Sequence, residues 1–268
     1  MIFHPGAKPD YNVRCFLICN PTTRTFKSIL PCSERKWTDS GLLYGFGYDI
    51  EHDDYKIIVT KFVFAEDDRP VCIYSLKTGL WSWTDLPTSV STGRCNWTII
   101  GEAIYVNNML HYLVTHEYKY FKIARFDIVS EKWRDDLNLP VQVSGYVQFG
   151  NLDGRLFLNV GEYKIVSSDV WMMEEYGSWK KMFHFSLDLF GRCPIARSKD
   201  GCDHRLLIRD EGDDTAEFFW YDQRDNTRIP FKLERSGRTG LYELCIASLV
   251  AIPGGCSLTK LQQLEDGA

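Results

Sequence analysis

One hairpin pattern recurs along the 268-residue chain and limits the folds open to it more than any other feature. The three clearest copies lie at 17–26, 72–81 and 124–133. In each copy a polar side chain that can start a turn stands six positions before an aromatic on the returning segment: Asn20 and Phe26, Ser75 and Trp81, Asp127 and Trp133. Weaker copies follow at 170–179, one residue longer, and at 220–229.

The distance between copies predicts the architecture. Successive turn-formers lie 55 residues apart (20 to 75) and 52 residues apart (75 to 127), a period that is typical of propeller blades and leaves room for four short strands. A β-sandwich also contains such hairpins, but the period favours the propeller. We therefore expect an all-β, kelch-like β-propeller of antiparallel four-stranded repeats, in a complete or an incomplete ring.

Between the hairpins, further runs have the composition of strands and are separated by turn-forming residues. Asn107-Asn108 and Asp153-Gly154 are residue types that accept the left-handed backbone of tight hairpins, so each pair predicts a turn. The strands that we expect between the hairpins are 55–64, 103–106, 109–114, 155–158 and 205–208.

Composition argues against several classes of partner. The 31 Lys and Arg residues are outnumbered by 36 Asp and Glu, and no basic stretch gathers to neutralise a phosphate backbone, so we expect no nucleic acid. The nine cysteines are an odd number without any Cys-x-x-Cys pair, which favours reduced thiols. With no signal peptide and no long apolar run, we expect no membrane partner and a cytoplasmic or nuclear location.

Four segments together resemble the plant F-box-associated interaction domain. Residues 44–49 read Tyr-Gly-Phe-Gly-Tyr-Asp and lead into Asp-Tyr-Lys at 54–56. The segments at 20–24, 71–81 and 171–179 are similar to other parts of that family, in the family's order, and the likeness runs from about Cys15 to about Ile252. The resemblance implies a kelch-related, propeller-like receptor of a cullin-RING (SCF-type) ubiquitin ligase. In that receptor the domain holds the target protein and an F-box docks a Skp-type adaptor.

The resemblance also divides the chain. We expect residues 1–14 to be an N-terminal remnant without an F-box, 15–253 to be the F-box-associated domain, and 254–268 to be a C-terminal tail. A Skp-type adaptor is then a partner only if an F-box is supplied elsewhere. The target protein is the expected partner, bound through loops.

The residues do not form a recognisable catalytic, metal or cofactor site. Gly45-x-Gly47 lacks the third glycine and the helix of a dinucleotide loop, so close backbone approach in a strand is the better interpretation. Asp49, Glu51 and Asp53 alternate as in a calcium loop, but the glycine and glutamate positions of such a loop hold other residues. His111 with His116, and Cys202 with His204, do not have zinc spacing. We expect no enzyme activity.

Interaction residues are predicted only as segments. The loops expected to contact a target are 33–41, 65–70, 88–94, 115–119 and 210–216, and Trp37 is the single side chain proposed as an exposed anchor. Two alternatives stay open at this point. One is a carbohydrate-binding or enzymatic kelch-type propeller, and the other is a truncated fragment that binds targets but recruits no ligase.

Overall fold

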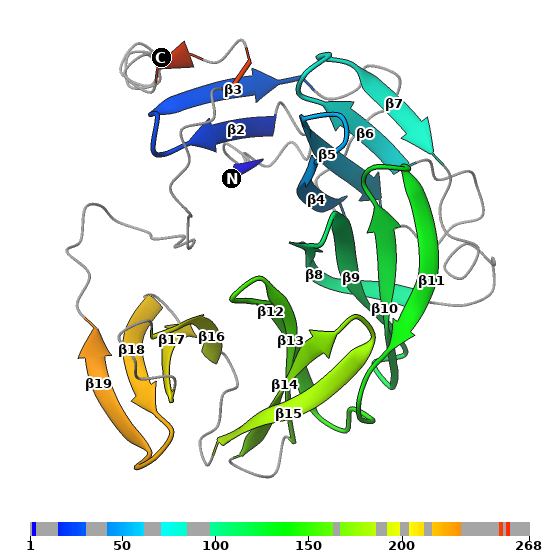
Figure 1. The fold of residues 1–268 in the computed structure, drawn as a ribbon. Coiled ribbons are helices and arrows are strands. Elements are labelled where there is room, and N and C mark those ends of the chain that lie inside the picture. Colours follow the sequence, from blue (N-terminus) through cyan, green and yellow to red (C-terminus); the bar gives the residue numbers. More distant parts are fainter. Residues whose placement is uncertain are drawn as a thin grey trace, which may run out of the picture. The chain divides into compact units, whose positions relative to one another are not determined.

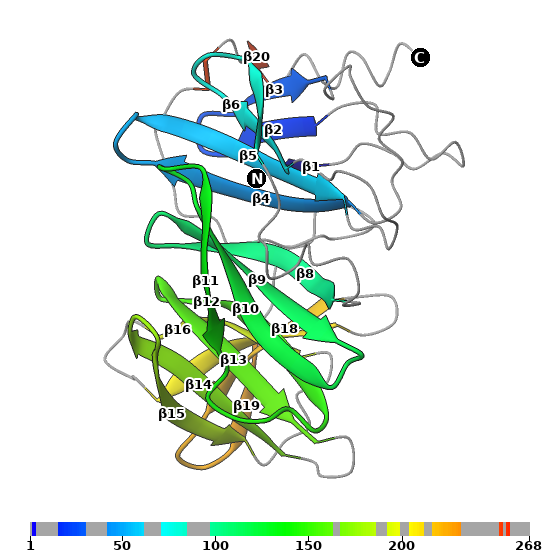
Figure 2. The same ribbon diagram turned by 90° about the vertical axis from the view of Figure 1, so that its right-hand side faces the viewer.

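In the computed structural model, the described residues are all strand, turn or irregular, and none of them is helical. They form twenty strands in five four-stranded sheets (Figures 1 and 2). The described part also includes no helix with the length and apolar character that crossing a bilayer requires. The described ranges are 2–3, 16–30, 42–61, 71–84, 97–162, 167–185, 192–198, 204–211, 216–231, 252–253 and 256–257.

Four of the five sheets are simple meanders of consecutive strands, whereas the first takes a strand from near each end of the chain. The first sheet contains β1 (Ile2–Phe3), β2 (Phe16–Asn20), β3 (Thr25–Ile29) and β20 (Cys256–Ser257). The second contains β4 (Leu42–Asp49), β5 (Asp54–Lys61), β6 (Val71–Ser75) and β7 (Trp81–Thr84). The third contains β8 (Trp97–Val106), β9 (Met109–His116), β10 (Tyr120–Asp127) and β11 (Lys132–Asn138).

The remaining sheets follow in chain order. The fourth contains β12 (Tyr146–Leu152), β13 (Arg155–Gly161), β14 (Ser168–Glu175) and β15 (Ser178–Phe185). The fifth contains β16 (Arg192–Arg197), β17 (Arg205–Glu211), β18 (Ala216–Asp222) and β19 (Thr227–Phe231). The four-stranded antiparallel repeat expected from the sequence period is therefore confirmed.

The chain divides into two compact units, and the third sheet contributes to both. The first unit comprises residues 1–112, 124–135 and 245–268, and the second comprises 113–123 and 136–244. In the first unit Phe16, Ile57 and Cys72 are fully buried in one core cluster, with Trp81 and Trp83 packed half-buried against it. In the second unit a separate cluster joins residues of the fourth and fifth sheets, including Phe157, Phe185, Leu206 and Ile208.

A shared hydrogen-bond pattern explains the repeated hairpin. The Asn20 carboxamide oxygen accepts from the Thr22 backbone N–H at 3.0 Å, and the Asp127 carboxylate accepts from Val129 N–H at the same distance. The side chain thus starts the turn, and a residue four positions on takes a left-handed backbone. These left-handed residues are Arg24, Asp53, Gly79, Glu131 and Asn226.

The same geometry accounts for the six-residue spacing to an aromatic. Two residues face each other across such a turn: the one just before the turn-former and the one six positions after the turn-former. Tyr74 and Trp81 form such a pair around Ser75, and Tyr48 and Tyr55 form one around Asp49. The rings of these pairs lie 5.1 Å and 4.9 Å apart between centroids, which is the range of favourable aromatic contact. The β4–β5 turn at Asp49 is therefore a further copy that the sequence period did not reveal.

The glycines of the 44–49 segment permit close approach within the first unit, as predicted. A Cβ atom at Gly47 would lie 2.1 Å from Ile128 Cδ1 and 2.5 Å from Tyr105 Cδ2. One at Gly45 would lie 2.4 Å from Leu110 Cδ1. Because β4 contacts side chains of the third sheet so closely, a Cβ at either position would force these neighbours to shift.

Candidate interaction surface

Each meander has two different ends. Because consecutive strands are antiparallel, the connections alternate between the ends of a sheet. In the third sheet the β8–β9 and β10–β11 turns share one end, and the β9–β10 turn lies at the other. In the second sheet the β4–β5 and β6–β7 turns share one end, and the opposite end holds the end of β5 and the start of β6. We name the end with the two short turns the turn end of a sheet, and the opposite end the loop end.

Of the five predicted contact loops, 115–119 is the one that the structure describes in full. Segments 33–41, 65–70 and 88–94 lie outside the described residues, and so does Trp37. In the fifth predicted segment only 210–211 and 216, at the ends of β17 and β18, are described. The candidate surface among the described residues is therefore the end of the β9–β10 hairpin.

At the end of this hairpin, two residues have backbone φ angles that are unfavourable for their residue types. The Lys119 backbone N–H donates to the His116 carbonyl oxygen at 3.0 Å, and the two central residues, Glu117 and Tyr118, have φ values of 53° and 52°. Two left-handed central residues define a turn that normally contains Asn or Gly. The β8–β9 turn of the same sheet follows that preference with Asn107 and Asn108, at 51° and 61°. A tyrosine in this conformation costs roughly 1 kcal/mol.

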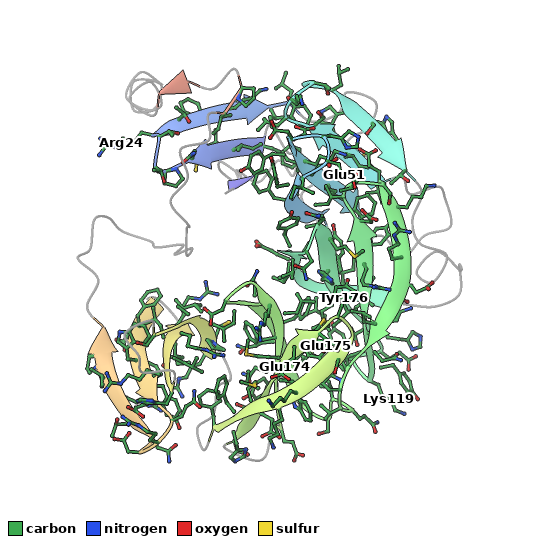
Figure 3. The ribbon with its side chains drawn as sticks, viewed as in Figure 1. Arg24, Glu51, Lys119, Glu174, Glu175 and Tyr176 are labelled. Atoms are coloured by element: carbon green, nitrogen blue, oxygen red, sulfur yellow. The ribbon has the colours of Figure 1, made fainter. Side chains whose placement is uncertain are left out.

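The side chains at this end form an exposed aromatic group, which we call the aromatic tip and define as residues 116–120. Tyr118 is 74% exposed and Tyr120 is 52% exposed. The Lys119 ammonium lies 5.3 Å from the Tyr120 ring centroid, and the His116 ring lies 6.2 Å from it. Figure 3 shows Lys119 at the free end of the hairpin.

Below the tip, the strand that carries it is anchored. Leu113, Val114 and Thr115 of β9 are fully buried, immediately before His116. Tyrosines on a fixed backbone lose little conformational freedom on binding, and tyrosine is enriched among the residues that dominate interface energies. The left-handed backbone of Tyr118 costs energy and its ring is exposed, so stabilisation of the fold does not explain a tyrosine at this position.

Other exposed side chains at the turn ends are less distinctive. Figure 3 labels Arg24, Glu51, Glu174, Glu175 and Tyr176, all at or beside such turns. Glu174 is paired with Lys180 at 3.0 Å, and the left-handed position next to Tyr176 is occupied by Gly177, so that turn has no comparable strain. Ile50 is exposed at the β4–β5 turn as a single aliphatic side chain, which is normal for a protein surface.

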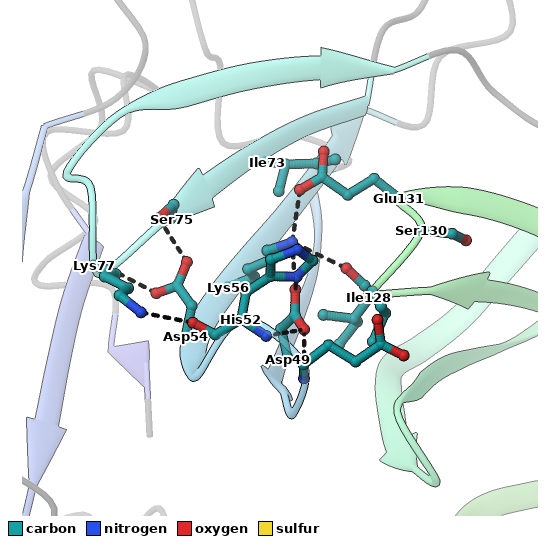
Figure 4. A network of polar contacts seen from close by, with 12 residues as sticks. Asp49, His52, Asp54, Lys56, Ile73, Ser75, Lys77, Ile128, Ser130 and Glu131 are labelled. Carbon is teal, nitrogen blue, oxygen red and sulfur yellow. Dashed lines mark hydrogen bonds and ion pairs between the residues drawn. The ribbon is translucent and has the colours of Figure 1, made fainter.

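A buried ion-pair network fixes the β4–β5 turn to the β10–β11 turn within the first unit (Figure 4). The Lys56 ammonium lies 2.8 Å from Asp49 Oδ2 and 2.7 Å from Glu131 Oε1, and it donates to the Ile128 carbonyl oxygen at 3.1 Å. Asp49 is fully buried. Burial alone would raise the pKa of Asp49, but the hydrogen bonds from Lys56 and His52 outweigh it and lower that pKa below its usual value.

The Lys56 ammonium is stabilised in the same way. Burial disfavours its charge, but the hydrogen bonds to Asp49 and Glu131 prevail and raise the pKa of Lys56. The pair is therefore ionised at neutral pH. We call these contacts of Lys56 with Asp49 and Glu131 the lock, because they hold the two turns together.

The other acidic residues of this turn do not form a metal site. Asp53 accepts a hydrogen bond from the Tyr48 hydroxyl at 2.6 Å. Among the described residues no three His, Cys, Asp or Glu side chains come together as metal ligands.

His111 and His116 have opposite environments although they share β9. His111 is fully buried, and its Nδ1 lies 3.2 Å from the Ile104 carbonyl oxygen. Burial is the main cause that lowers the pKa of His111 to about 4. His116 belongs to the partly exposed aromatic tip.

Comparison with known proteins agrees with this architecture of repeated four-stranded sheets and identifies the class as a β-propeller-type domain. Residues 10–238 match the family model described as the F-box associated beta propeller domain. The chain belongs to this family, which confirms the resemblance seen in the sequence.

Curated relatives from Arabidopsis thaliana have the same character. The chain is 26% identical to the F-box protein CPR1, over 87% of this chain and 63% of that protein. It is 29% identical to an F-box/kelch-repeat protein, over 65% of this chain and 48% of the relative. The chain thus spans about half to two thirds of the length of these relatives. Among solved structures it is similar to TolB from Acinetobacter baumannii at a TM-score of 0.41 and 12% identity, over 83% of this chain and 54% of that one.

Proposed function

We propose that this chain is the target-recognition part of an F-box receptor, and that it binds a protein which an SCF-type ligase then ubiquitinates. The observation that carries the proposal is the family match over residues 10–238. The relatives that cover most of this chain are named as F-box proteins, which supports a role in the same kind of receptor. Docking to a Skp-type adaptor belongs to the F-box of such a receptor.

The aromatic tip is the part of the described surface that we assign to the target. Its Tyr118 and Tyr120 rings offer apolar faces with a hydroxyl at the edge, so they fit a pocket that is apolar inside and polar at its rim. The turn holds Tyr118 in position before the partner arrives, which lowers the entropy lost on binding. Truncating a tyrosine at the centre of an interface typically costs about 2 kcal/mol of binding free energy.

Quantitative affinity purification from plant tissue tests this proposal. The tagged chain is compared with a Tyr118→Ala, Tyr120→Ala variant and with an Ile50→Ala variant, which removes a similarly exposed apolar side chain from a turn end. We expect a specific protein to be recovered by the unmodified chain and by Ile50→Ala, and to be depleted with the double variant. The recovered protein should also accumulate when cullin-RING ligases are inhibited.

Two results would contradict the proposal. If the double variant recovers the same protein in the same amount, the aromatic tip is not the contact. If the abundance of the recovered protein does not change when the ligases are inhibited, target recognition for ubiquitination is wrong.

A further inference from the structure

Three uncharged polar side chains lie on one face of the fourth sheet, within the second unit. Gln148 on β12 pairs directly with Asn159 on β13, and Ser168 on β14 pairs with Gly161, two positions after Asn159 (Figure 1). Residues that face each other across antiparallel strands point to the same side of the sheet, and so do alternate residues of one strand. Asn159 and Ser168 are therefore diagonal neighbours on that side.

This face packs against the fifth sheet. Val170 stands opposite Asn159, and Phe185 stands opposite Ser168. Both belong to the apolar cluster that joins the fourth and fifth sheets. Asn159 is 0% exposed and Ser168 is 2% exposed. Two polar side chains are thus shielded from bulk water within an apolar core.

The protein pairs these polar groups only in part. The Asn159 amide Nδ2 donates to Gln148 Oε1 at 2.9 Å. Asn159 Oδ1 and Ser168 Oγ, in contrast, have no hydrogen-bond partner among the described residues. Turning the Asn159 amide over exchanges its two polar atoms and still leaves one of them unpaired. Because a buried polar atom without a partner loses its hydration and gains nothing in return, two of them side by side destabilise a dry core.

We propose that Asn159 and Ser168 form a buried binding site for one small, neutral, hydrogen-bonding molecule, and that this molecule is water. The ligand is neutral because the side chains that surround the site are uncharged, and it is small because both are buried. Buried waters make about three hydrogen bonds to polar groups that the protein leaves unpaired. This water donates to Asn159 Oδ1 and bonds to Ser168 Oγ, so it links β13 to β14. The inference does not depend on the proposed function.

The sign of one stability change tests the site. Ser168→Ala removes the hydroxyl and adds no bulk. If water is bound, that water loses a partner, and the equilibrium constant for unfolding in urea should rise about fivefold, the effect of one typical hydrogen bond. If the site is dry, the variant removes an unpaired polar atom, so an unchanged or lower constant would overturn the proposal.

The matched control is Ser178→Ala. Ser178 is exposed at the start of β15, so the same chemical change there should alter the unfolding constant by less than about twofold. An equal rise for both variants would show that the effect belongs to the serine-to-alanine change and not to the site, which would also contradict the proposal.

A double-mutant cycle tests whether one molecule contacts both side chains. Asn159→Leu is made alone and together with Ser168→Ala. Because the first substitution already removes the shared water, Ser168→Ala should raise the unfolding constant about threefold less in the Asn159→Leu chain than in the unmodified chain. Equal effects in the two backgrounds would refute a shared molecule.

If Asn159→Leu does not fold, a crystal structure of the unmodified chain decides. Density for a water should lie within about 3 Å of both Asn159 Oδ1 and Ser168 Oγ. A site without such density, or a Ser168 hydroxyl bonded to a protein acceptor, would show that no molecule binds there.

Discussion

His111 should make the stability of the first unit depend on pH between 7.5 and 5. Its side chain is fully buried, and burial lowers its pKa from 6.5 to about 4. In the unfolded chain the pKa returns to 6.5, so between pH 6.5 and 4 the unfolded state binds more protons than the folded state. Stability from this group is complete above pH 6.5 and is lost as the pH falls.

The two pKa values set the magnitude. Linkage between a folded pKa of about 4 and an unfolded pKa of 6.5 predicts a loss of about 2 kcal/mol between pH 7.5 and pH 5, and about 3 kcal/mol in total below pH 4. Carboxylates such as Asp49, whose pKa is lowered from 3.8, lose their contribution only as the pH falls below that value. The range from pH 7.5 to 5 therefore separates the histidine from the carboxylates.

Urea unfolding followed by circular dichroism, at pH 7.5 and pH 5.0, measures this effect. The control is His111→Gln, which keeps a hydrogen-bond donor for the Ile104 carbonyl oxygen but does not titrate. The free energy of unfolding should fall by about 2 kcal/mol more in the unmodified chain than in the variant over this pH range. If the two chains lose the same amount, His111 is not held neutral by burial and the reasoning is wrong.

Three further predictions concern the lock, the close approach of β4 and the aromatic tip. Lys56→Met should lower the free energy of unfolding by about 3 kcal/mol, because Asp49 stays buried without its cation. The control Lys77→Met, at an exposed turn, should change the free energy of unfolding by less than about 0.5 kcal/mol. Equal losses for the two variants in urea unfolding would contradict the structural role of the Lys56 ion pairs. Gly47→Ala should cost about 2 kcal/mol through overpacking against Ile128, and an unchanged thermal midpoint would show that there is room for a Cβ. Tyr118→Asn should stabilise the fold by about 0.5 kcal/mol, because asparagine suits the left-handed turn, and a lower thermal midpoint would show that Tyr118 is retained for stability.

Local periodicity was sufficient to predict most of the strands and hairpins, although β12 and β16 were not predicted. Turn-formers such as Asn20 and Asp127 act on backbone atoms two or three residues away, so their effect is visible in the sequence. The close approach at Gly45 and Gly47 was also predictable, because few other physical causes explain a glycine between strand-forming residues. The copy at Asp49 was missed because its alternating acids resemble a calcium loop, although Tyr55 follows at the same six-residue spacing.

Contacts between distant segments were not predictable. Lys56 and Glu131 are 75 positions apart, and neither stands out in its own segment. The exposure and strain of Tyr118 were also hidden, since a tyrosine among strand residues normally indicates a strand rather than a left-handed turn. The segment 115–119 was predicted only as a contact loop. Trp37, the one side chain singled out from the sequence, stays a prediction because it lies outside the described residues.

The affinity of the purified chain for the protein recovered from plant tissue is the most direct test of target recognition by the aromatic tip. Isothermal titration calorimetry should give a Kd at least tenfold weaker for Tyr118→Ala, in line with a loss of about 2 kcal/mol at a central tyrosine, and an unchanged Kd for Ile50→Ala. An unchanged Kd for Tyr118→Ala, or an equal loss for Ile50→Ala, would contradict recognition through this hairpin.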